Sequence, residues 1–149
     1  MFYFIHVIAG AVVAKYFLGI FPVIILNLIS HFILDIIPHR DNLFEKKLSK
    51  NSYNIKITKK AVLFEAIDAF IGLILIIVIY LKFSSLLMLF SIFISLSPDV
   101  IKLSHFILKD NKFFIRYLYF HSAIQTEISW ISGIIVQVII TIILLKILF

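Results

Sequence analysis

The stretch that decides the fold is AVLFEAIDAFIGLILIIVIYL, residues 61–81. It carries only two charged side chains, Glu65 and Asp68, and both lie near its start. An apolar run of about 20 residues is long enough to cross the roughly 30 Å hydrocarbon core of a bilayer as a helix. The stretch therefore predicts a membrane-spanning helix.

The composition of the whole chain agrees with this stretch. Of the 149 residues, 62% are hydrophobic and 15% are charged, and the mean hydropathy is +1.13. A soluble domain is roughly 45–50% apolar and about 25% charged, and a chain of this size could not bury the excess. These values exclude a soluble enzyme, a disordered region and an ordinary nucleic-acid-binding module. We expect the lipid bilayer to be a partner and nucleic acid not to be one.

Further apolar runs on both sides of residues 61–81 predict additional spans. Pro22 suits the first position of a helix, and Pro38 ends one. The segment 99–116 mixes four basic residues with apolar ones, which is typical of an amphipathic helix at the membrane surface. We predict an all-α integral membrane protein in which residues 1–149 form a single transmembrane helical domain. It would have about five transmembrane helices plus a short interfacial helix, the other spans being 2–21, 22–37, 83–96 and a last one from 115 or 128 to 149.

Basic residues predict the orientation. The loop 38–60 contains half of the 14 Lys and Arg residues, and the segment 98–116 contains four more. Lys-rich loops between spans stay in the cytoplasm, and the predicted topology puts both segments on one side. We therefore expect a multi-pass protein of the inner (cytoplasmic) membrane with a cytoplasmic N-terminus and a basic cytoplasmic loop at 38–60.

The His, Asp and Glu residues in or next to the predicted spans all lie near the cytoplasmic ends of their helices. Such residues are rare in membrane spans and are functional candidates by default. His31 and Asp35 are four residues apart and share one helix face. Cysteine is absent, so a metal would be bound by imidazole and carboxylate, which suit zinc and other divalent ions. We predict a divalent-metal site, with zinc as the first choice and manganese or magnesium as alternatives, whose ligands are His6, His31, Asp35, Asp68, Asp99 and His121.

Other polar residues near these ligands predict supporting roles. His39 and Glu65 are candidates for the general acid or base, which needs hydrogen-bond reach to the reacting water. Gln125 and Glu127 are candidates for orienting the ligands.

One motif resembles that of a known family. Residues 30–39, Ser-His-Phe-Ile-Leu-Asp-Ile-Ile-Pro-His, resemble the HxxxDxxPH core of small inner-membrane proteins, the predicted metal-dependent hydrolases that include LexA-regulated bacterial members. The resemblance extends to residues around His6, to Ser97-Pro98-Asp99 and to His121-Ser122, and there is a looser likeness to zinc-dependent phospholipases. The chain departs from the family pattern at 100–102, where a second acid and a His are usual, and at 119–120, where Arg-Gly is usual. The resemblance implies a membrane-bound metal-dependent hydrolase.

The chemistry of the predicted site points the same way. A bound metal would lower the pKa of its water and polarise the group under attack. A site at the depth of the lipid head groups suits a phosphoester or lipid-like substrate. Two alternatives remain open: a non-enzymatic membrane protein that binds or conducts a metal ion or protons, and a structural membrane scaffold joined by polar pairs. An oligomer is compatible with all three.

Overall fold

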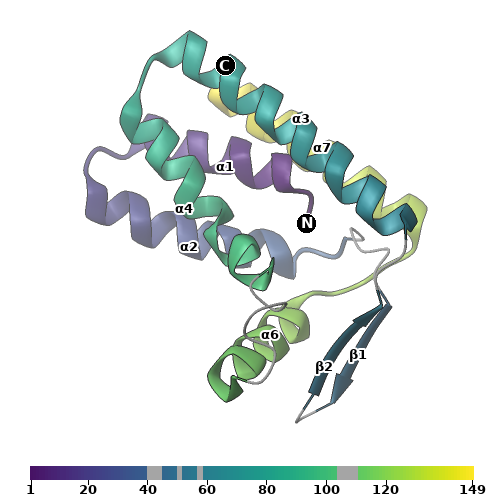
Figure 1. Ribbon diagram of the computed structural model, residues 1–149. Coiled ribbons are helices and arrows are strands. Elements are labelled where there is room, and N and C mark those ends of the chain that lie inside the picture. Colours follow the sequence, from purple (N-terminus) through teal and green to yellow (C-terminus); the bar gives the residue numbers. More distant parts are fainter. Residues whose placement is uncertain (40–44, 50–51, 57–58, 104–110) are drawn as a thin grey trace.

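The computed structural model describes residues 1–39, 45–49, 52–56, 59–103 and 111–149. In these residues it contains six helices and two strands (Figure 1). In chain order they are α1 (Tyr3–Tyr16), α2 (Ile20–Ile36), β1 (Glu45–Ser49), β2 (Ser52–Lys56), α3 (Lys59–Phe83), α4 (Leu86–Leu103), α6 (Lys112–Ile124) and α7 (Trp130–Leu148).

The prediction of a helical protein is confirmed, with one addition in the basic loop. Strands β1 and β2 pair antiparallel, with Glu45 opposite Lys56 and Ser49 opposite Ser52. Residues 52–56 alternate polar and apolar side chains, which is the period-two pattern of a strand. The segment predicted to be only a loop therefore contains a hairpin. Its cytoplasmic location stays a prediction.

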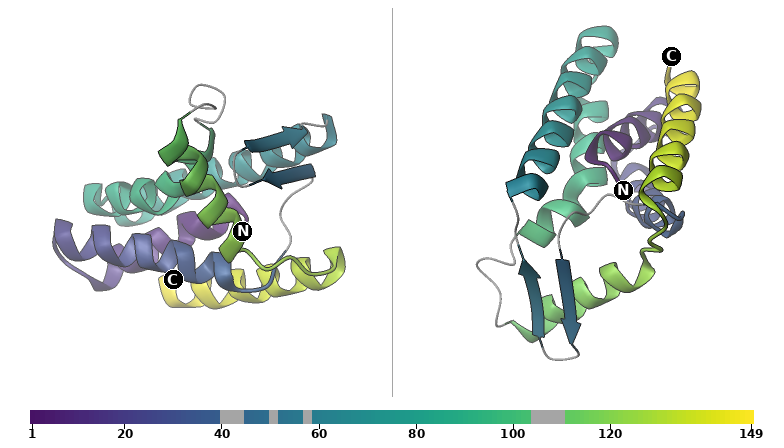
Figure 2. Two further views of the ribbon diagram at one scale, coloured as in Figure 1. Left: turned by 90° about the horizontal axis from the view of Figure 1, so that it is seen from below. Right: turned by 90° about the vertical axis from the view of Figure 1, so that its right-hand side faces the viewer.

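Helix α1 lies at the centre of the molecule. It packs against α2, α3, α4 and α7, and Figure 2 shows it between α3 and α7 in the right-hand view. Its buried face includes Ile5 and Ile8 together with small residues, Ala9, Gly10 and Ala11. Small residues let helix backbones approach closely, which is the usual basis of helix packing in membranes.

The number of membrane spans differs from the prediction. Among the described residues, Val62–Phe83 and Trp130–Leu148 are long and apolar enough to cross a membrane, and only 17% of each is buried inside the molecule. Helix α1 has 14 residues and α2 has 17, so they measure about 21 and 25 Å, less than the roughly 30 Å that a span needs. The prediction of five spans is therefore wrong by this measure. Hydropathy counts apolar residues whether or not they are helical, so it included Phe17 and Leu18 in the first span. In the structure Phe17–Gly19 form a turn in which Gly19 has a φ of 109°.

The fourth apolar run was predicted to end at Ser97-Pro98 or to continue past the proline as a kinked helix. Helix α4 takes the second course and continues through Pro98 to Leu103. Proline cannot donate to the carbonyl four residues earlier, and the Ser97 hydroxyl donates to that carbonyl, Ile94 O, at 2.8 Å. Of the predicted interfacial segment, residues 104–110 lie outside the described part. The amphipathic helix is α6, with exposed Phe113 and Phe120.

Candidate metal centre

Four buried side chains from three helices form a compact group. They are His31 and Asp35 of α2, Asp99 of α4 and His121 of α6, and one ligand atom from each lies within 4.8 Å of all the others. In Figure 1 the ends of α2 and α4 meet next to α6. Three segments that are distant in the sequence therefore deliver two imidazoles and two carboxylates to one place. We call these four residues the His/Asp group.

The distances within the His/Asp group match those around a shared ion. His31 Nε2 lies 3.3 Å from His121 Nε2 and 3.6 Å from Asp35 Oδ2. Asp35 Oδ2 lies 3.4 Å from His121 Nε2. Zinc binds imidazole nitrogen and carboxylate oxygen at about 2.0–2.2 Å, so neighbouring ligands of a tetrahedral ion are about 3.3–3.6 Å apart. Asp99 Oδ1 is farther away, 3.7 Å from His121 Nε2 and 4.0 Å from His31 Nε2. The first three residues fit a tetrahedral centre, and Asp99 stands at its edge.

The orientation of His31 suits a ligand. Its Nδ1 lies 2.8 Å from the backbone carbonyl of Ser95. A carbonyl only accepts hydrogen bonds, so Nδ1 carries the proton and Nε2 presents its lone pair to the other three residues. Metal-binding imidazoles are commonly fixed by such a hydrogen bond from the second ring nitrogen.

Helix α6 positions His121 and is fixed to α4. The Asn111 side chain caps its first turn by accepting from Phe113 N and Phe114 N. The Tyr117 hydroxyl donates to Pro98 O at 2.8 Å, and burial raises the pKa of Tyr117 to about 12, which keeps this donor protonated. Burial, with a further contribution from the Lys102 ammonium, lowers the pKa of His121 to about 4. The imidazole is therefore neutral at pH 7, which is the form that binds metals.

His6 faces the same two carboxylates from the other side. Its Nε2 lies 3.4 Å from Asp35 Oδ1 and 3.8 Å from Asp99 Oδ2, whereas the opposite oxygen of each carboxylate faces the two other imidazoles. The His6 ring also stacks on His31, with ring centroids 4.1 Å apart. The structure therefore brings His6 to the edge of the His/Asp group. Gln125 contributes as well, since its Nε2 donates to Asp35 Oδ2 at 3.2 Å.

The other predicted ligand, Asp68, has a different partner. Its carboxylate accepts hydrogen bonds from Tyr3 N at 2.7 Å and Phe4 N at 3.2 Å, the first amide groups of α1. The first amides of a helix have no partner within it and carry a partial positive charge, so a carboxylate stabilises them. Asp68 therefore holds the start of α1 against α3 and is not a member of the His/Asp group.

The two predicted acid–base residues also lie outside the His/Asp group. The Nδ1 of buried His39 donates to Ile37 O at 2.7 Å, and its backbone forms a bridge with Glu127. Glu65 accepts a hydrogen bond from the Tyr3 side chain. The catalytic roles of His39 and Glu65 and the orienting role of Glu127 stay predictions.

Several polar residues near the site were missed in the sequence. Asn27 Nδ2 donates to Ser91 Oγ at 2.7 Å, the Ser91 hydroxyl donates to Gly10 O at 2.6 Å, and the Ser95 backbone carbonyl accepts from His31 Nδ1. Lys102 forms an ion pair with Asp99. A pattern could have revealed three of these residues, because polar side chains recur every fourth position in two ladders: Asn27, His31 and Asp35 on α2, and Ser91, Ser95 and Asp99 on α4.

Comparison with known proteins adds no further constraint. No family model, curated protein or solved structure matches this chain. What this protein does is therefore inferred from the residues of the His/Asp group and their surroundings.

Proposed function

We propose that this protein is an integral membrane, metal-dependent hydrolase that acts on a phosphoester or lipid-like substrate. The observation that supports it is the buried His/Asp group, whose spacing fits a single divalent ion. Such an ion would act as a Lewis acid and would lower the pKa of bound water. Zinc is the first choice because two neutral imidazoles and a carboxylate are a known ligand set of catalytic zinc.

The distances assign different roles within the group. A catalytic zinc keeps three protein ligands and leaves the fourth position to water. His31, Asp35 and His121 have the shortest mutual distances, so we assign them as ligands. Asp99 is the most distant member, and we assign its carboxylate to accept a proton from the attacking water.

The resemblance and the exposed apolar helices support the family and the location that we propose. His31, Asp35, Asp99 and His121 come from three of the motif segments that resemble the predicted membrane-bound metal-dependent hydrolases. Helices α3 and α7 expose apolar side chains along their lengths, as lipid-facing helices do. We propose membership of that family and a multi-pass location in the inner membrane, with the N-terminus in the cytoplasm.

Metal analysis with a matched pair of variants tests the proposal. Wild type, Asp35→Asn and Asp68→Asn are purified in detergent, and bound metals are measured by mass spectrometry. Both variants neutralise one buried carboxylate, but only Asp35 belongs to the His/Asp group. We expect about one equivalent of metal in the wild type and in Asp68→Asn and almost none in Asp35→Asn. Hydrolysis of phospholipids and generic phosphoesters is then measured with the metal-loaded protein.

Two results would refute this assignment. One is a wild-type protein that binds no zinc, manganese or magnesium after reconstitution. The other is a metal that is lost equally from both variants. A metal-loaded protein that hydrolyses none of the phosphoesters would refute the hydrolase and leave the metal site intact.

A second candidate function, conduction of a metal ion or protons, is favoured by the polar ladders. Buried Asn27, Ser91 and Ser95 continue from the His/Asp group along α2 and α4. Conduction predicts that proteoliposomes containing the protein pass zinc or protons and that Asn27→Leu stops this flux. The hydrolase hypothesis predicts no flux above that of empty liposomes.

A further inference from the structure

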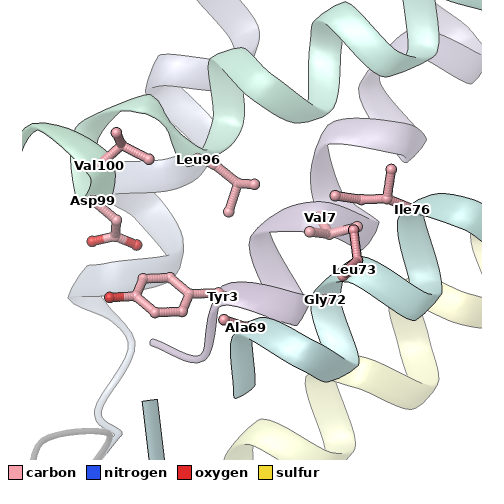
Figure 3. A pocket seen from close by; sticks show the side chains of 9 residues that line it. All are labelled: Tyr3, Val7, Ala69, Gly72, Leu73, Ile76, Leu96, Asp99 and Val100. Atoms are coloured by element: carbon pink, nitrogen blue, oxygen red, sulfur yellow. The ribbon is translucent and has the colours of Figure 1, made fainter. Parts of the chain in front are cut away.

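A pocket of about 270 Å³ lies between α1, α3 and α4 and ends at the His/Asp group (Figure 3). We propose that this pocket binds one alkyl chain of an amphiphilic phosphoester and thereby places its head group at the His/Asp group. This inference rests on the proposed hydrolase function and specifies its substrate class, a single-chain amphiphile.

Small residues on α3 create the pocket. Ala69 and Gly72 face α1 where larger side chains would fill the space. A Cβ atom on Gly72 would lie 3.7 Å from a methyl group of Val7, an ordinary contact, so the backbone does not require glycine at this position. The hollow is thus a consequence of side-chain size, and it can be filled by substitution without moving a helix.

The lining is apolar along almost its whole length, and Asp99, whose two carboxylate oxygens are buried, lies at one end. Val7, Leu73, Ile76 and Leu96 make the apolar part, and Figure 3 shows the Tyr3 hydroxyl and the Asp99 carboxylate together at the opposite end. Asp99 is also a member of the His/Asp group. Ligand pockets generally combine apolar walls with a few polar groups that fix the orientation of the ligand. The apolar wall matches an alkyl chain, and the position of Asp99 sets the end of the pocket at which we place the head group.

The size of the pocket limits what it can hold. Pockets for drug-sized ligands have volumes of about 300–1,000 Å³, so 270 Å³ is too small for a two-chain lipid tail. Along α3 the lining extends from Ala69 to Ile76, which is about 10 Å at the helical rise. One extended alkyl segment of moderate length fits these dimensions.

The pocket opens towards the surface that would face lipid. Leu73 and Val100 line it and are 53% and 57% exposed, so its mouth lies between α3 and α4. Helix α3 is one of the two helices long and apolar enough to cross a membrane. An alkyl chain would therefore enter sideways from the hydrocarbon, with its head group left at the end that carries Asp99.

Binding of alkyl phosphates to filled-pocket variants tests this inference. Wild type, Ala69→Leu and Ala66→Leu are transferred to amphipol and loaded with zinc, and binding of radiolabelled dodecyl phosphate and butyl phosphate is measured. Both substitutions put leucine at an exposed alanine of α3, but only Ala69 lines the pocket. Gly72→Ala is a second, milder filling variant, because the added methyl group makes only ordinary contacts.

We expect the wild type to bind dodecyl phosphate at least about tenfold more tightly than butyl phosphate, since a tenfold ratio corresponds to about two buried methylene groups. Ala69→Leu should lose about tenfold in dodecyl phosphate binding and Gly72→Ala a few-fold, with butyl phosphate binding and zinc content unchanged. Ala66→Leu should behave as the wild type.

Equal binding of the two phosphates, or equal losses in Ala69→Leu and Ala66→Leu, would overturn the pocket assignment. The hydrolase proposal is tested separately by measuring release of inorganic phosphate. If dodecyl phosphate binds selectively but is not cleaved, the pocket stands and the hydrolase fails. If both phosphates are cleaved with no chain preference, the hydrolase stands and the pocket fails.

Discussion

Replacing Gly10 by alanine should push α1 and α4 apart, and the structure allows the cost to be worked out. A Cβ atom at Gly10 would lie 2.8 Å from Ile92 Cα, 3.0 Å from Ser95 Cβ and 3.1 Å from Ser91 O. Two of these are backbone atoms, which cannot rotate away. The helices would have to separate by about 0.6 Å to restore even a tight 3.4 Å contact.

Overpacking of this kind costs about 1–3 kcal/mol, and stretching the hydrogen bond from the Ser91 hydroxyl to Gly10 O costs about 1 kcal/mol more. Alanine recovers about 1 kcal/mol through its higher helix propensity. We therefore expect Gly10→Ala to lower the free energy of unfolding by about 2 kcal/mol. Gly72→Ala is the matched control, because its nearest contact would be 3.7 Å, and it should be neutral or up to about 1 kcal/mol more stable.

The assay is reversible unfolding of both variants in mixed detergent micelles, followed by circular dichroism, together with zinc titration. Because α4 carries Asp99 and the Ser95 carbonyl that holds His31, its displacement should also weaken zinc binding about tenfold, or about 1.4 kcal/mol. If Gly10→Ala is as stable as Gly72→Ala and binds zinc as the wild type does, then α1 and α4 are not in the close contact described above.

Three further substitutions separate the roles of residues around the site. Lys102→Met should raise the affinity for zinc about tenfold, because the ammonium that pairs with Asp99 repels a nearby divalent ion. Competition with a chelator measures this affinity, and an unchanged value would contradict the prediction. Asp68→Asn should reduce the unfolding free energy by about 1 kcal/mol, measured by denaturation, because it weakens a charged anchor for the start of α1. Tyr117→Phe removes the hydrogen bond to Pro98 O and should lower the free energy of unfolding by about 1 kcal/mol in the same measurement. Its zinc stoichiometry should not change, and loss of zinc would indicate a direct role for the hydroxyl.

Sequence reasoning anticipated the grouping of four buried side chains better than it anticipated the spans, and metal binding by this group stays a prediction. His31, Asp35, Asp99 and His121 were identified because ionisable side chains in apolar helices are conspicuous, and helix periodicity aligned the first two. The break between the first two helices was expected at residues 19–22, and the structure places it at residues 17–19. Because Phe17 and Leu18 are apolar, hydropathy alone assigned them to the first span, although α1 has only 14 residues.

Sequence reasoning was least informative where one residue type serves two purposes. A carboxylate near a membrane surface can bind a metal or hold the start of a helix, and no local pattern told Asp68 from Asp35. The amides of Tyr3 and Phe4 contact Asp68, whereas the Met1 amine, 3.0 Å from Oδ1, and the His6 imidazole contact Asp35, and this difference is a property of helix packing. The ion pair between Lys102 and Asp99 could have been expected, because the two residues are three positions apart on one helix.

The contacts between α1, α2 and α4 argue against conduction along the polar ladders. Hydrogen bonds of 2.7 Å from Asn27 to Ser91 and of 2.6 Å from Ser91 to Gly10 O join the three helices along the path that an ion would take from the His/Asp group. At Gly10 the backbones are so close that even a methyl group does not fit, which leaves no room for a hydrated ion. The pocket between α1, α3 and α4, in contrast, reaches Asp99 from the apolar surface of α3. The polar side of the site is therefore closed by its own hydrogen bonds, whereas its other side borders an apolar pocket that opens towards the surface of α3, and this asymmetry supports the proposed entry of an amphiphile from the bilayer.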